Sequence, residues 1–164
     1  MIKLTPAVKG LITGLLMVAV GLALHYTNTS VTSPLQYIAY FIYGLGIVWS
    51  VQEFYKKTGG AASFGELFNQ GFKCFVVVTL VMAVFTIVFY KANEAIIHEK
   101  GELTRKELLK TDRNRTPAEI DRMVAEGKKY FIPMATSMTV FQYLLIGAIV
   151  TAATAGSLSL RKKN

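Results

Sequence analysis

Four long apolar stretches take up most of this chain, and nearly every charged residue lies between or outside them. A helix of about 20 apolar residues crosses the hydrocarbon core of a bilayer, where only helices and closed barrels satisfy their backbone hydrogen bonds. The pattern therefore predicts an all-α integral membrane protein, a four-helix bundle in a single domain. The expected spans are about residues 8–26, 35–54, 67–90 and 131–158.

The composition supports a membrane protein and argues against a separate soluble catalytic domain and against a nucleic-acid-binding protein. Of the 164 residues, 52% are hydrophobic and 17% charged, whereas soluble domains carry about a quarter charged residues. The spans leave no room for a separate soluble catalytic domain. The net charge of +8 sits at span ends, which argues against nucleic acid as a partner. The single cysteine, Cys74, excludes an internal disulfide and is expected to be buried.

Local signals mark where the first three spans begin and end. The first has no small-residue cleavage pattern after it and is expected to be retained. Pro34 suits the first turn of the second span. That span is expected to carry interfacial aromatic residues at both ends: Tyr37, Tyr40, Phe41 and Tyr43 at one, Trp49, Phe54 and Tyr55 at the other. Gly59 and Gly60 break the helix before the third span, and Ser63 with Glu66 fits a capping box.

Residues 91–130 form the only hydrophilic segment, with ten Lys/Arg and eight Asp/Glu. We expect a charged helical hairpin here. The third span extends to about Gly101, a short helix follows near 105–110, and another covers 117–129. Capping boxes are predicted at Thr104 with Glu107 and at Thr116 with Glu119, and a helical ion pair joins Glu102 to Lys106.

The last apolar run, residues 131–160, is uncharged, and Pro133 is expected to start the fourth helix. Cations decide the orientation. Eight Lys/Arg fall on the two tails and on the connection between the second and third spans, and none on the first loop. The positive-inside rule then places both termini in the cytoplasm. Two glycosylation triplets, at Asn28 and Asn114, fall on the outer side and matter only in a eukaryotic secretory context.

Small residues four apart allow helix backbones to approach closely in lipid. They form lines on the first and last spans, which suit either packing inside the bundle or docking of another membrane protein. These residues are Gly10 and Gly14 on the first span, and Gly147, Thr151, Ala155, Ala148, Ala152 and Gly156 on the fourth.

Chemistry-bearing patterns are missing from the sequence. No metalloprotease, Cys-x-x-Cys, Walker or nucleophile-elbow motif occurs, so no catalytic residue, metal ligand or cofactor is predicted. A proton relay would require an acidic or basic residue at the middle of a span, and none of the four spans has one there. Gln142, Asn69 and Gln70 are read as interhelical or interfacial hydrogen-bonding groups.

One short motif resembles a known family. It opens the third span and consists of Ser63, Phe64, Gly65, Glu66, Phe68, Gly71 and Phe72. Together with the layout of spans, it is similar to the bacterial membrane family catalogued as domain of unknown function 4199. The resemblance implies a bacterial inner-membrane protein and supplies no activity. Members are sometimes encoded near sugar-transferring enzymes, which implies a lipid-linked-sugar glycosyltransferase as one partner.

Our leading hypothesis is a non-catalytic accessory or scaffold subunit, in contact with membrane lipid, that binds another membrane protein. The alternative is a small transporter or lipid-handling protein acting as a homo-oligomer, with a polar cavity lined by Gln142, Asn69 and Gln70. A third, enzymatic hypothesis requires Glu94, His98 and Glu99 to converge.

Overall fold

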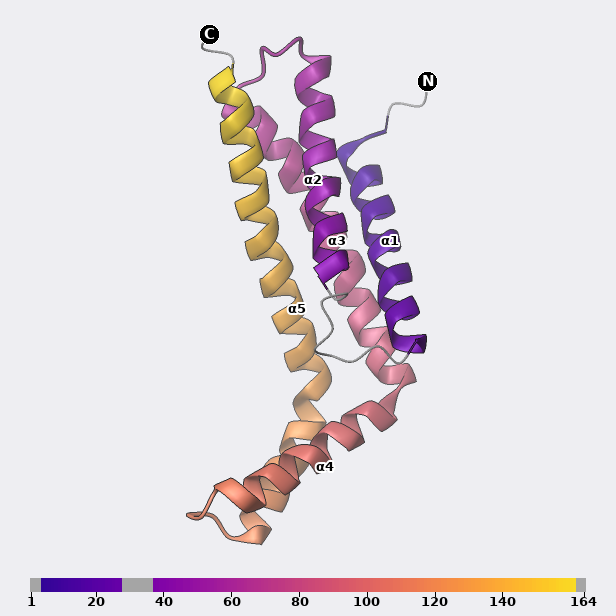
Figure 1. Ribbon diagram of the computed structural model, residues 1–164, viewed down its shortest axis with the longest axis vertical. Helices are drawn as coiled ribbons and strands as arrows, with labels where there is room; N and C mark the ends of the chain where they lie inside the picture. The colour runs from indigo at the N-terminus through magenta and orange to yellow at the C-terminus, as the bar shows by residue number, and fades with distance from the viewer. Residues whose placement is uncertain (1–3, 28–36, 162–164) are drawn as a thin grey trace. The chain divides into compact units, whose positions relative to one another are not determined.

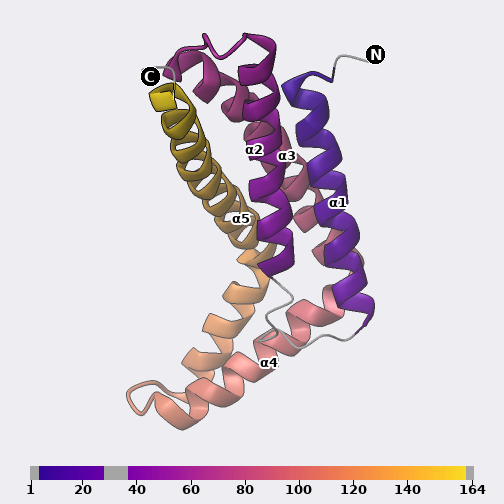
Figure 2. The same ribbon diagram turned by 45° about the horizontal axis from the view of Figure 1, so that its top comes forward.

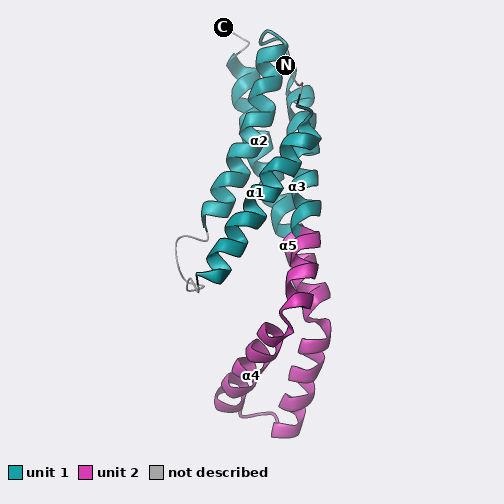
Figure 3. Cartoon of the chain, turned by 90° about the vertical axis from the view of Figure 1, so that its right-hand side faces the viewer, with its two compact units in different colours: residues 1–82, 140–164 teal, residues 83–139 magenta. Residues whose placement is uncertain are grey.

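The computed structural model describes residues 4–27 and 37–161, and this part of the chain is all-α. Five helices follow one another along it: α1 (Pro6–Tyr26), α2 (Tyr37–Lys57), α3 (Phe64–Ala92), α4 (Glu94–Thr111) and α5 (Pro117–Arg161) (Figure 1). The chain divides into two compact units (Figure 3). Unit 1 comprises residues 1–82 and 140–164, and unit 2 comprises residues 83–139.

Three of these helices, α1, α3 and α5, contain a stretch long and apolar enough to cross a membrane. The protein therefore has the character of a membrane protein. Helix α2 falls short of this hydropathy because its tyrosines, tryptophan, glutamine and glutamate lower it. Pro34 and the Asn28 triplet, to which the sequence assigned a helix start and a glycosylation pattern, lie outside the described residues.

Unit 1 packs α1, α2 and the adjoining halves of α3 and α5 side by side (Figures 1 and 2). Helices α1 and α2 run antiparallel, since Lys9 near the start of α1 pairs with Glu53 near the end of α2. One helical turn along α1, the Thr13 side chain lies against Gly46 of α2. The interior that these two helices share with α3 contains fully buried apolar side chains: Met17, Tyr43, Ile47, Val51, Leu67, Cys74 and Val78.

Tyr43 corrects the predicted aromatic belt. Tyr37 and Phe41 are exposed, as interfacial residues would be, but Tyr43 is 0% exposed. Its hydroxyl donates a hydrogen bond to the Tyr143 carbonyl oxygen at 2.7 Å, and the two rings meet edge to face. A buried phenol needs such an acceptor. Tyr43 therefore joins α2 to α5 and does not lie at the membrane interface.

Unit 2 is a helical hairpin in which α4 runs antiparallel to the first part of α5 (Figures 2 and 3). Ile97 on α4 and Ile120 and Val124 on α5 are its buried apolar side chains. Two ion pairs cross the hairpin, Arg105 to Asp121 at 2.6 Å and Lys128 to Glu102 at 2.9 Å. The predicted charged hairpin is present, but two of its predicted boundaries are wrong.

The first wrong boundary concerns α3, which ends at Ala92 and not near Gly101. Asn93 leaves the helical conformation at φ −127° and ψ 52°, and its side-chain amide donates to the Phe89 carbonyl oxygen at 2.8 Å. This local bond competes with the helix. Helix α4 then runs unbroken through the predicted 105–110 helix, so Thr104 lies inside it and the predicted Thr104–Glu107 capping box is wrong.

The second wrong boundary concerns Pro133, which lies inside α5 and does not start a helix. A proline within a helix removes one hydrogen bond and costs about 3 kcal/mol. Helix α5 nevertheless continues through Pro133 for 45 residues in all.

Both remaining capping boxes are confirmed. Glu66 accepts hydrogen bonds from the Ser63 amide and hydroxyl at 2.8 and 2.7 Å, and Glu119 accepts from Thr116 in the same way at 2.7 and 2.9 Å. The predicted ion pair between Glu102 and Lys106 is wrong. The Glu102 carboxylate instead accepts a hydrogen bond from Lys128 of α5, and no ion pair with Lys106 forms in the described hairpin.

Candidate functional site

The small residues of α5 form two lines with different surroundings. Thr151 and Ala155 are 0% exposed, and a Cβ added to Gly147 would lie 2.6 Å from the Phe75 ring. Thr151 in turn packs on Gly71 of α3. This line therefore lies inside unit 1, where small residues let α5 approach α2 and α3.

The first-span glycines are used in the same way. A Cβ on Gly10 would lie 2.5 Å from the Cys74 carbonyl oxygen, and one on Gly14 would lie 3.0 Å from the Val81 side chain. Both contacts join α1 to α3. Only glycine allows backbones to come this close. Cys74, beneath Gly10, is fully buried as predicted, and its thiol points to the Gly46 carbonyl oxygen at 3.8 Å.

The second line of α5, Ala148, Ala152 and Gly156, is only half-buried. No atom lies within 4 Å of a Cβ placed on Gly156. On a different face of α5, this helix and the end of α2 enclose a groove of about 330 Å³ with polar walls, here called the polar groove. Its lining residues are Val48, Gln52, Ala153, Thr154, Ser157, Leu158 and Arg161.

A buried charge cluster was missed by the sequence analysis. Lys9 is 3% exposed, and its ammonium lies 2.6 Å from a Glu53 carboxylate oxygen and 5.3 Å from the centre of the Trp49 ring. Lys57 pairs with the other oxygen of Glu53. Two signals could have revealed the cluster. Glu53 is the first acidic residue of the chain, and Lys9 shares a helix face with Thr13.

The family-like motif at the start of α3 has a structural role. Ser63 and Glu66 cap the helix, and Gly71 admits Thr151. The aromatic members stack along the helix: the Phe64 and Phe68 rings are 5.9 Å apart, and Phe72 meets Phe75 at 5.2 Å. Gly65 is exposed, with nothing within 4 Å of an added Cβ. The motif thus starts α3 and sets its distance from α5.

The polar residues considered for transport do not gather in unit 1. Gln142 is exposed and donates to the Tyr40 hydroxyl at 2.7 Å. Asn69 and Lys73 are exposed near the start of α3. No pocket found in the described residues brings Gln142 together with Asn69 or Gln70.

The acidic residues of the enzymatic hypothesis are also separate from any cavity. Glu94, His98 and Glu99 are all exposed on α4, and none lines the cleft described next. The described residues contain no group of three side chains able to hold a metal ion. The condition that the enzymatic hypothesis required is not met.

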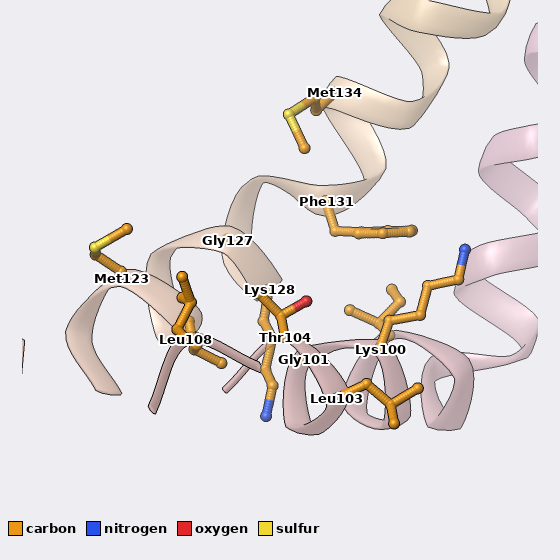
Figure 4. Close-up of a pocket in the computed structure, with 12 residues that line it drawn as sticks. Lys100, Gly101, Leu103, Thr104, Leu108, Met123, Gly127, Lys128, Phe131 and Met134 are labelled. Atoms are coloured by element: carbon orange, nitrogen blue, oxygen red, sulfur yellow. The ribbon is translucent and has the colours of Figure 1, made fainter. Parts of the chain in front are cut away.

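A cleft of about 440 Å³ lies between α4 and α5 in unit 2 (Figure 4). Its walls are mainly apolar side chains, with two glycines and the stems of two lysines. The lining residues are Ile97, Lys100, Gly101, Leu103, Thr104, Leu108, Met123, Val124, Gly127, Lys128, Phe131 and Met134.

Charge around this cleft is arranged by the two cross-hairpin ion pairs. The Lys128 ammonium holds the pKa of the Glu102 carboxyl below its usual range, mainly by its hydrogen bond. Arg105 lowers the pKa of Asp121 in the same way, and Asp121 raises that of Arg105. Lys100 instead lies over the rings of Tyr90 and Phe131, at 5.8 and 5.4 Å.

Comparison with known families identifies the chain's relatives. Residues 9–158 match the family described as "Protein of unknown function (DUF4199)". The chain belongs to this family. The family resemblance drawn from the Ser63–Phe72 motif is therefore confirmed. No curated protein and no solved structure matches the chain, so the DUF4199 assignment brings no activity with it.

Proposed function

We propose that this DUF4199 protein is a non-catalytic accessory or scaffold subunit that binds another membrane protein. The observation that carries the proposal is the filled interior of unit 1. Tyr43, Ile47 and Val78 are 0% exposed, and the inner small residues are occupied by neighbouring helices. A unit whose interior is filled by side chains is better suited to binding a partner protein than to conducting a substrate.

The proposal includes four membrane crossings. Helix α2 runs antiparallel to α1 from the Lys9–Glu53 pair to a pocket near the far end of α1, lined by Leu24 and Ala39 among others. A helix that packs along a membrane-spanning helix over its whole length crosses the same thickness of membrane. This supports a four-helix bundle with its termini on one side. The location we propose is the inner membrane of a bacterium, with both termini cytoplasmic.

The polar groove between α2 and α5 is the partner site that we propose. Its polar residues, including Gln52, Ser157 and Arg161, offer hydrogen bonds that lipid tails cannot use, and polar groups favour helix association in membranes. Ala153 and Ser157 in its wall are small and allow a partner helix to approach closely. A glycosyltransferase that handles lipid-linked sugars remains the candidate partner.

Affinity purification of the full chain in mild detergent tests the proposal. Ala153 is exposed and lines the groove, so Ala153→Leu should fill it and release a co-purifying protein. Ala19→Leu is the matched control, because Ala19 is equally exposed on α1. The wild type and this control should retain the partner. A protein that always elutes alone, or a partner retained by Ala153→Leu, would refute the proposal.

The homo-oligomer alternative makes a different prediction in the same experiment. Two differently tagged copies of the chain would then co-purify as the main complex. The exposed Gln142, already bonded to Tyr40, would have to lie at the interface between copies, and Gln142→Leu would separate them. Recovery of self-complexes that depend on Gln142 would favour this alternative over a scaffold.

A further inference from the structure

The cleft between α4 and α5 exposes apolar side chains that a hairpin in water would normally cover. Leu103 is 59% exposed, Met134 60% and Met123 40%. Figure 4 shows Phe131 and Met134 along α5 and Leu103 and Leu108 along α4, all of which line the cleft, here called the slot. A contiguous exposed apolar surface of this kind marks a binding site, and the cavity volume of about 440 Å³ is that of a small-ligand pocket.

The size of the slot excludes a protein helix as its occupant. An α-helix with its side chains is about 10–12 Å across, so 440 Å³ would hold only about one turn. A single extended hydrocarbon chain is narrow enough to lie along the whole slot. Gly127 provides this depth because no atom lies within 4 Å of a Cβ placed on it, whereas the Lys128 stem packs on Gly101.

The charges that line the slot are complementary to an anion. The lining includes Lys100 and Lys128 but no Asp or Glu. Lys128 is paired with Glu102 at 2.9 Å, while no ion pair is found for Lys100 within the described residues. Its ammonium rests on the Tyr90 and Phe131 rings, so it can still bind a phosphate oxygen as a point charge.

The neighbours of Lys100 place this cation at the depth of lipid headgroups. Tyr90 and Phe131 are the last and first residues of the third and fourth spans assigned from the sequence, 67–90 and 131–158. Aromatic residues at span ends lie in the interfacial zone. A cation stacked on both rings therefore lies beside phosphate groups of the bilayer.

We infer that the cleft binds one acyl chain of an anionic phospholipid from the surrounding bilayer, with the lipid phosphate on Lys100. The acyl chain leaves the bilayer and lies between α4 and α5 toward Leu108 and Met123, the end of the slot opposite Lys100 (Figure 4). The site does not involve the polar groove between α2 and α5, so this inference stands independently of the proposed scaffold function.

Photo-crosslinking tests this inference with the full chain in lipid nanodiscs. The probe is phosphatidylglycerol with a diazirine on one acyl chain, compared with phosphatidylcholine carrying the same label. Gly127→Leu fills the slot, and no atom lies within 4 Å of the new Cβ, so the hairpin should fold. Loss of burial for only two methylenes weakens binding about tenfold, and labelling at Leu108 and Met123 should fall by at least that factor.

The charge requirement is tested separately. Lys100→Gln should reduce the preference for phosphatidylglycerol over phosphatidylcholine about fivefold. Lys106→Gln removes a cation from the same helix outside the lining and is the matched control. Equal labelling of the wild type and Gly127→Leu, or adducts confined to the spans, would overturn the inference. Circular dichroism of each variant checks that the helices remain.

Discussion

The two units of this protein use opposite means of joining helices. In unit 1 the contacts are made by glycines and threonines that bring backbones together, as Gly10 does with Cys74 and Gly71 with Thr151. In unit 2 the helices are joined by exposed ion pairs and leave an apolar slot between them. Lipid tails are as apolar as the side chains, so no hydrophobic effect drives helices together inside a membrane. Such helices associate by close packing.

Residues 91–130 of unit 2 have the composition of a segment in water, where charged pairs contribute little. Exposed ion pairs add about 0–1 kcal/mol each, so Arg105–Asp121 and Glu102–Lys128 set the alignment of the hairpin more than its stability. The comparison therefore predicts large losses from changes inside unit 1 and small ones from changes in unit 2.

The largest effect is expected at Gly147. A leucine there would overlap Phe75, whose Cβ would lie 2.8 Å from the new Cβ, and overpacking of this kind costs about 3 kcal/mol. Thermal unfolding in mild detergent should show a clear loss of stability. Gly156→Leu on the same helix meets no atom within 4 Å and should unfold like the wild type. Equal behaviour of the two variants would contradict the assignment of inner and outer lines.

A smaller loss is expected when the buried charge cluster is broken. Glu53→Gln removes the carboxylate from Lys9, which is 3% exposed, and leaving a buried cation without its counter-ion should cost about 2 kcal/mol. Asp121→Asn breaks an exposed pair in unit 2 and should cost less than about 1 kcal/mol. Chemical denaturation of both variants measures the difference, and a larger loss for Asp121→Asn would reverse the comparison.

Thr151→Val should change stability in the opposite direction. The Thr151 hydroxyl is buried without a hydrogen-bond partner among the described residues, while its methyl group packs on Gly71. Replacing the hydroxyl by a second methyl keeps the shape and removes an unsatisfied polar group, which should stabilise unit 1 by about 1 kcal/mol. An upward shift of the melting temperature in detergent is the expected result, and a downward shift would indicate that the hydroxyl is bonded.

The smallest effect is a dependence of unit 2 on acid. Glu102 and Asp121 have pKa values below their usual range because of Lys128 and Arg105. The ion pairs are therefore fully formed above about pH 4, the ordinary carboxyl value, and are lost as the pH falls through the lowered folded pKa values. Hydrogen exchange, corrected for intrinsic rates, should rise in α4 below pH 4 while residues 37–47 of α2, which include no carboxylate, are unchanged. Exchange in α4 that does not respond to acid would exclude these pairs as the cause.

The helices and both confirmed capping boxes could be predicted from the sequence because they depend on residues three or four positions apart, such as Ser63 and Glu66. The break at Asn93 and the continuation through Pro133 could not, since each is a balance between one local residue and the helix around it. The Lys9–Glu53 pair was also missed, because its partners lie 44 positions apart and only the packing of α1 on α2 brings them together.

Crosslinking in native membranes is the most direct test of a packed unit 1 that holds a partner at its polar groove. A photoreactive residue at position 157, which lines the groove, should give one discrete adduct with another protein. The same residue at position 15, where Leu15 is 55% exposed on α1, should react with lipid alone. Lipid adducts at both positions would contradict the account.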